Sequence, residues 1–166
     1  NTFSTALIQK PLELGATLSL ISTTKFINGH SDALGGAVLT NNEEWNSKML
    51  FSQKALGLQP SPFDSWLITR GVKTLPLRIE QQTKSAEIIS KEFENHRIIN
   101  KVLYPFNQKH PQFNLAKSQM KSGGSMITLK LNLNKADTLK FCKSLKYFSL
   151  AESLGGIESL ICHPAT

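Results

Sequence analysis

The chain has 166 residues, 40% of them hydrophobic, which is enough to bury the core of one domain or of parts of two. Its formal net charge is +7, but the lysines are spread along the whole sequence and only three residues are arginines, so a nucleic-acid-binding surface is not indicated. No apolar run reaches the roughly 18 residues that a membrane span needs, and no secretory signal opens the sequence, so we expect a cytoplasmic protein without nucleic-acid or membrane partners.

The two cysteines, Cys142 and Cys162, belong to no Cys-x-x-Cys pair. Neither a zinc site nor a disulfide framework is therefore expected, and reduced thiols suit a cytoplasmic location. The first residue is Asn1 rather than Met, so we expect the chain to be a fragment or a processed product.

The first part of the chain predicts short alternating elements. We expect a helix over Pro11–Ala16, strands over Thr17–Ser22 and Ala37–Thr40, a helix over Asn41–Leu56, and a Pro/Gly/Ser-rich connection over Gly57–Trp66. An order of helix, strand, loop, strand and helix indicates an α/β layered domain.

The second part begins with a long amphipathic helix over Leu75–Asn95, which we expect to lead from one domain into the next. After it we expect strands over Arg97–Pro105, Ser125–Leu133 and Lys146–Ser153, and helices over His110–Met120 and Asn134–Leu145. The chain thus divides into an α/β part (residues 1–80) and an α+β unit (residues 81–166).

Lys25 lies in "STTKFINGHSDALGG", directly after a predicted buried strand. In α/β folds, the loops that follow such strands carry active sites. The preceding hydroxyl residues could bind a phosphate, the lysine could form an imine with an aldehyde, and Gly29, Gly35 and Gly36 allow close approach of the backbone. From these residues alone, an ordinary loop lysine remains the simpler interpretation.

Several motifs resemble the Cys/Met-metabolism family of pyridoxal-phosphate enzymes, which includes cystathionine γ-synthase, cystathionine and methionine γ-lyases, and O-acylhomoserine sulfhydrylases. The motifs that carry the resemblance are "STTKFINGHSDALGG", "PSPFDSWLITRGVKTLPLRIEQQ", "VLYP" with "HPQFNLAKSQM", and "FSLAESLGGIESLICHPAT". They follow the family's order and span nearly the whole chain. The resemblance implies a fold-type I α/β fragment: the C-terminal part of the cofactor-binding domain over residues 1–80, and an incomplete α+β C-terminal domain over residues 81–166.

The resemblance also implies roles for individual residues. Lys25 would carry pyridoxal 5'-phosphate and later move protons between substrate carbons, while Ser22 and Thr24 would bind the cofactor phosphate. Ser153 would position the lysine and the substrate carboxylate. Glu152 would lie near the distal amino group of the substrate, an ordinary loop glutamate being the alternative. Arg70 and Arg78, which match the family's "RGLKTLxxR", would be mainly structural.

The implied function is γ-replacement or γ-elimination on an amino-acid substrate in trans-sulfuration and methionine biosynthesis, most like cystathionine γ-synthase. A cystathionine or methionine γ-lyase, an O-acylhomoserine sulfhydrylase and a non-catalytic remnant are the alternatives. The family's ring-nitrogen aspartate would directly precede Asn1, and its carboxylate-binding arginine would follow Thr166, so we expect the isolated chain to be inactive. A complete chain would form a homotetramer. Lys54 and Phe106 depart from the usual residues, which bears on substrate fit.

Overall fold

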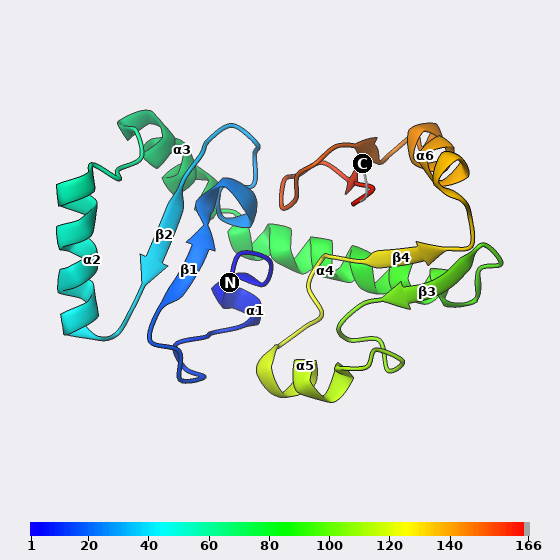
Figure 1. Ribbon diagram of the computed structural model, residues 1–166, viewed down its shortest axis with the longest axis horizontal. Helices are drawn as coiled ribbons and strands as arrows, with labels where there is room; N and C mark the ends of the chain where they lie inside the picture. The colour runs from blue at the N-terminus through cyan, green and yellow to red at the C-terminus, as the bar shows by residue number, and fades with distance from the viewer. Residues whose placement is uncertain (165–166) are drawn as a thin grey trace.

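The long helix α4 (Leu75–Glu92) is the axis of the structure. The computed structural model describes residues 1–164, and Figure 1 shows α4 (green) beginning beside the N-terminal elements near the middle of the view and continuing into the region of β3 and β4. Pro76 lies in its first turn, and five residues at helical spacing are buried: Leu75, Ile79, Thr83, Ala86 and Ser90. The predicted helix over Leu75–Asn95 is confirmed, with its last three residues forming the 3₁₀ turn η2 (Phe93–Asn95).

The N-terminal half contains an antiparallel strand pair, β1 (Ser19–Ser22) and β2 (Gly36–Leu39). A turn of π-helix, η1 (Thr23–Ile27), follows β1 directly. Helix α2 (Glu43–Leu56) begins where the Asn42 side chain accepts a hydrogen bond from the backbone N–H of Trp45 at 3.0 Å. The predicted strands and this helix are confirmed: β1 and α2 are shorter than predicted, and β2 begins and ends one residue earlier.

Two predictions for this half are wrong. The predicted helix over Pro11–Ala16 is a set of hydrogen-bonded turns, because Gly15 adopts φ +94° and the backbone N–H of Ala16 closes on the carbonyl of Pro11 at 2.9 Å. Part of the predicted connection is helix α3 (Pro62–Val72), which Ser61 caps by accepting a hydrogen bond from the Asp64 N–H at 3.0 Å. The single turn α1 (Thr5–Ile8) has no predicted counterpart.

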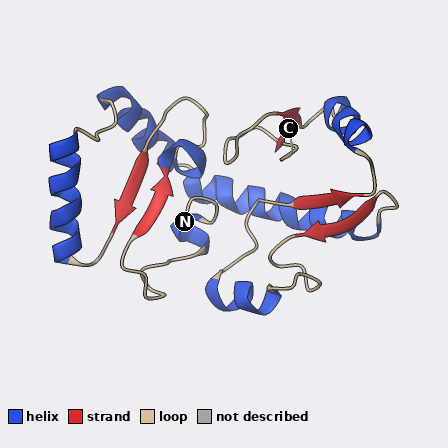
Figure 2. Ribbon diagram, viewed as in Figure 1, coloured by secondary structure: helices blue, strands red, loops and turns tan. Residues whose placement is uncertain are grey.

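The C-terminal half contains two more strand pairs (Figure 2). Its elements are β3 (Ile99–Leu103), α5 (Phe113–Gln119), β4 (Thr128–Leu131), α6 (Lys135–Ser144), β5 (Ser149–Leu150) and β6 (Leu160–Ile161). The β3–β4 pair is antiparallel, whereas β5 and β6 are parallel. Each predicted element of this half is confirmed in shortened form. Strand β6 was not predicted.

Two apolar clusters lie along α4. The first joins Ile8, Phe26, Leu75 and Ile79 with the half-buried Ile27, Met120 and Leu154. The second joins Ala86, Val102 and Tyr104 with residues of β3, β4 and their surroundings. Since the first cluster draws on both halves of the chain, and α4 crosses residue 80 without a break, the division at residues 80 and 81 stays a prediction.

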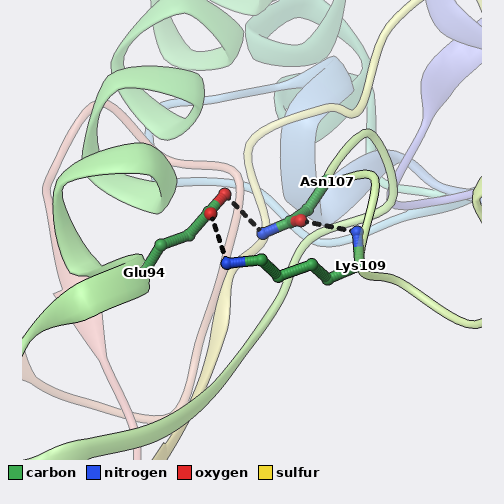
Figure 3. A network of polar contacts seen from close by, with 3 residues as sticks. All are labelled: Glu94, Asn107 and Lys109. Atoms are coloured by element: carbon green, nitrogen blue, oxygen red, sulfur yellow. Dashed lines mark hydrogen bonds and ion pairs between the residues drawn. The ribbon is translucent and has the colours of Figure 1, made fainter.

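A polar network fixes the end of η2 to the segment after β3 (Figure 3). Glu94 accepts hydrogen bonds from Asn107 Nδ2 at 2.9 Å and from Lys109 Nζ at 3.0 Å, while Asn107 Oδ1 accepts from the Lys109 N–H at 2.9 Å. These residues line a cavity of about 410 Å³. Because their polar groups hydrogen-bond to one another, we interpret the network as structural. Within residues 1–164, every helix is too short or too polar to cross a membrane.

Tyr104 connects the second cluster to the segment before β4. It is 2% exposed, and its hydroxyl donates a hydrogen bond to the carbonyl of Gly124 at 2.9 Å. Burial raises the pKa of Tyr104 well above its usual range, and the negative charge of Glu87 raises it further. The hydroxyl therefore stays protonated at physiological pH and remains a donor.

We predict that Tyr104→Phe lowers the free energy of unfolding by about 1–2 kcal/mol, because the Gly124 carbonyl loses its donor in a buried place. Urea denaturation measures the change. Tyr147→Phe, at a residue that is 88% exposed, is the matched control and should change stability by less than about 0.5 kcal/mol. Equal effects of the two substitutions would contradict the prediction.

Candidate active site around Lys25

Lys25 lies in the π-helical turn η1 at the end of β1, not in the loop that the sequence predicted. The backbone leaves helical geometry at Lys25 itself, with φ −91° and ψ −122°. The turn is held by hydrogen bonds from the Asn28 N–H to Thr23 O at 2.9 Å and from the Gly29 N–H to Lys25 O at 2.8 Å.

The Lys25 side chain borders a cavity of about 550 Å³, a volume in the usual range for small-molecule sites. The lining residues come from η1, the following loop, α3 and the C-terminal part of the chain: Thr24, Lys25, Ser31, Asp32, Ala33, Leu34, Asp64 and Ser153. Lys25 is half-buried, and its ammonium makes no hydrogen bond or ion pair within residues 1–164. The cavity thus holds a lysine that is available to a ligand.

The structure brings together three of the five predicted site residues, Thr24, Lys25 and Ser153. Ser22 is half-buried at the end of β1, and Glu152 is exposed; neither lines the cavity. The roles assigned to all five residues stay predictions.

Gly35 holds the residues that precede Lys25. The Thr24 hydroxyl accepts a hydrogen bond from the Gly35 N–H at 3.0 Å and donates to the Gly35 carbonyl at 3.3 Å. A Cβ on Gly35 would lie 2.6 Å from Thr23 Oγ1, so this approach requires glycine. The hydrogen bond that Thr24 donates to Gly35 is long, so its hydroxyl could rotate and donate to an anion in the cavity instead. The Ser22 hydroxyl makes no hydrogen bond within residues 1–164 and could donate to an anion without losing one.

The loop that carries Ser153 packs directly against η1. Gly155, at φ +79°, lies so close that an added Cβ would be 2.6 Å from the backbone N of Phe26. Gln82 on α4 donates a hydrogen bond to the Gly156 carbonyl at 2.9 Å. These two contacts explain why Ser153 reaches the cavity of Lys25.

Sequence reasoning missed Asp64, Ser31 and Asp32. Asp64 is the third residue of α3, and its carboxylate accepts a hydrogen bond from the Ser61 hydroxyl at 2.9 Å. The pattern Ser-Pro-x-Asp is a helix-start signal that would have placed Asp64 at an N-terminus. Ser31 and Asp32 lie within the motif "STTKFINGHSDALGG" that carries the family resemblance, although the motif alone assigns neither residue a role. Asp32 is fixed by the fully buried Asn28, whose Nδ2 donates to it at 2.8 Å.

The sequence profile described as "Cys/Met metabolism PLP-dependent enzyme" matches residues 1–166. A cystathionine gamma-synthase of Mycobacterium bovis is 42% identical over 99% of the chain and 42% of its own length. A cystathionine beta-lyase of Coxiella burnetii is 43% identical over 99% of the chain and 43% of its own length.

The chain is also similar to a solved structure of cystathionine gamma-synthase from Xanthomonas oryzae pv. oryzae in complex with aminoacrylate and cysteine. The TM-score is 0.97 at 44% identity, and the match covers 100% of this chain but 43% of that one. The chain therefore spans less than half the length of these relatives.

We predict that Gly155→Ala lowers the free energy of unfolding by more than Gly57→Ala does. Both residues have positive φ, which costs alanine about 1–2 kcal/mol, but a Cβ on Gly57 meets nothing within 4 Å, whereas one on Gly155 overlaps the backbone of Phe26. Urea denaturation of both variants checks the difference. Equal losses would mean that the Ser153 loop is not tightly packed on η1.

Proposed function

The chain belongs to the Cys/Met-metabolism family of pyridoxal-phosphate-dependent enzymes, and from this membership we propose that it is the cofactor-lysine part of an enzyme of sulfur amino-acid metabolism. The predicted fold class, a fold-type I α/β fragment, is confirmed by the match to the synthase structure. The observation that carries the proposal is the cavity that unites Lys25, Thr24 and Ser153, with the lysine ammonium facing no partner in the described chain.

The residues of the cavity fit pyridoxal phosphate. Its aldehyde needs a primary amine, which Lys25 provides, and its phosphate needs donors, which the Thr24 hydroxyl provides at the lining of the cavity. Ser22, at the end of β1 and off the lining, stays a proposed second donor. When bound, the cofactor supplies an aldehyde for covalent attachment and a ring that delocalises negative charge from the substrate carbon.

The chain's own residues would then act as follows. Lys25 would attach the cofactor and, once its amine is free, would act as the base at the substrate: removal of the α-proton and then of a β-proton permits elimination or replacement at the γ-carbon. Thr24 and Ser22 hold the phosphate and so fix the ring relative to Lys25. Ser153, on the lining of the same cavity, would orient the Lys25 amine and the substrate carboxylate. Glu152, beside Ser153, would meet the distal amino group.

For the complete protein we propose the reaction of a cystathionine γ-synthase, in which the sulfur of cysteine replaces the acyl-oxygen substituent of an O-acylhomoserine. The similarity to cystathionine gamma-synthases supports a substrate or product of the cystathionine type, whereas Glu152, exposed and off the lining of the cavity, adds no structural support. Cystathionine or methionine γ-lyase and O-acylhomoserine sulfhydrylase are the alternatives, as is a non-catalytic remnant. The similarity to the cystathionine beta-lyase of Coxiella burnetii makes cystathionine β-lyase a further alternative, which the motifs in the sequence did not indicate.

We further propose a cytoplasmic homotetramer for the complete protein, with a small amino-acid substrate and without nucleic-acid or membrane partners. The free thiols of Cys142 and Cys162 support a reducing compartment. The wide spread of the lysines supports the absence of a nucleic-acid site.

We predict that the chain, incubated with pyridoxal phosphate and then reduced with borohydride, carries the pyridoxyl group on Lys25 in excess over every other lysine. The reason is that the Lys25 amine borders a cavity with hydroxyl donors, whereas surface lysines capture the aldehyde without selectivity. Peptide mass mapping identifies which lysine carries the pyridoxyl group. Lys25→Ala should abolish the selective product and Lys54→Ala, at an exposed lysine, should leave it intact. Labelling spread evenly over all lysines would refute the cofactor role.

We predict little turnover by these 166 residues alone, because the family resemblance places the ring-nitrogen aspartate and the carboxylate-binding arginine outside them. Loss of one preorganised hydrogen-bonding group commonly costs about 10²–10³ in kcat, so we expect activity at least about a thousandfold below that of the M. bovis synthase. The assays are cystathionine formation from an O-acylhomoserine and cysteine, and breakdown of cystathionine alone. Turnover near that of the complete relative would contradict this expectation.

A further inference from the structure

Arg78 on α4 reaches the backbone directly after Lys25. Its Nη1 donates a hydrogen bond to the Phe26 carbonyl at 2.7 Å, and its Nη2 donates to the Ile27 carbonyl at 3.2 Å. The same Nη2 donates to the Gly71 carbonyl at 2.9 Å, and Nε donates to Thr74 Oγ1 at 3.0 Å. One guanidinium thus connects η1, the end of α3 and the start of α4.

The carbonyls of Phe26 and Ile27 need such a donor. The last carbonyls of any helix have no partner within that helix, and η1 is a single turn whose backbone leaves helical geometry at Lys25. Burial lowers the pKa of Arg78 from its ordinary value, yet a guanidinium stays charged at neutral pH and keeps all its donors.

Two glycines allow the close packing around the guanidinium. A Cβ on Gly29, which has φ +73°, would overlap the guanidinium of Arg78 itself. A Cβ on Gly71 would overlap the carbonyl of Asn28, so α3 could not lie this close to the end of η1. The Phe26 side chain, 1% exposed, is itself held in the first apolar cluster. The backbone that follows Lys25 is therefore fixed by packing and by hydrogen bonds together.

We propose that Arg78 is a positioning residue for Lys25: by fixing the peptide planes of Phe26 and Ile27, its guanidinium sets where the lysine side chain enters the cavity. The proposal rests on the proposed function, in which the Lys25 amine must meet the cofactor. A lysine at position 78 would keep the charge but not the planar fork that spans carbonyls of η1 and α3.

The test compares Arg78→Gln and Arg78→Lys with Arg70→Gln, all in the 166-residue chain. Arg70 lies exposed in the last turn of α3 and is the matched control. The first measurement, hydrogen exchange of the Asn28 and Gly29 amides, needs no cofactor. The second is the yield of borohydride-trapped pyridoxyl group on Lys25. Thermal unfolding verifies that each variant is folded, and Arg78→Lys, which keeps the stem and the charge, serves if Arg78→Gln unfolds.

We expect Arg78→Gln to speed exchange of the two amides about tenfold, since charge-assisted hydrogen bonds are lost, and to lower capture at Lys25 about tenfold through misplacement of its amine. Arg78→Lys should restore less than half of the capture, and Arg70→Gln should leave both measurements unchanged. Exchange that stays slow in both Arg78 variants would overturn the proposal, as would fast exchange with undiminished capture. If the unsubstituted chain shows no preference for Lys25, the proposed function fails, while the exchange measurement still decides whether Arg78 fixes this backbone.

Discussion

The position of Lys25 depends on the burial of its neighbour. Phe26 is 1% exposed and packs against Ile8, Leu75 and Ile79, so the chain on either side of it cannot move without opening the first apolar cluster. Burial of a phenylalanine contributes roughly 1.5–3 kcal/mol, a large share of the stability of a small domain. Since successive side chains leave the backbone in different directions, a buried Phe26 holds Lys25 at the boundary between core and cavity.

Helix α4 serves both the core and the site. Near its start, Leu75 and Ile79 pack under Phe26, and the guanidinium of Arg78 caps the carbonyls of η1. One turn further, Gln82 binds the Gly156 carbonyl and so holds the loop of Ser153. The cavity residues Lys25 and Ser153, remote in sequence, are therefore supported by neighbouring turns of one rigid element, which is the arrangement that precise positioning requires.

Sequence reasoning succeeded where short-range rules act alone. The cap at Asn42 and the left-handed Gly57 define the ends of α2, and the apolar period defines α4. It failed at residues 11–16, where Gly15 ends the structure after one turn, and at α3, where Pro/Gly/Ser composition concealed the cap of Ser61. The π-helical turn of Lys25 has no sequence signature, because it forms only with the support of other segments.

For the site, the residues alone indicate the available chemistry: an amine at Lys25 preceded by hydroxyls, within motifs of a family to which the chain belongs. Which of these residues meet depends on the packing of segments that are distant in the chain. This packing placed Thr24 and Ser153 on the cavity of Lys25, left Ser22 and Glu152 off its lining, and added Asp64. It also set Arg78 on the carbonyl of Phe26, 52 positions away. Such contacts depend on how α4 packs and where glycines allow close approach, and no local pattern encodes a distance between segments so remote in the chain.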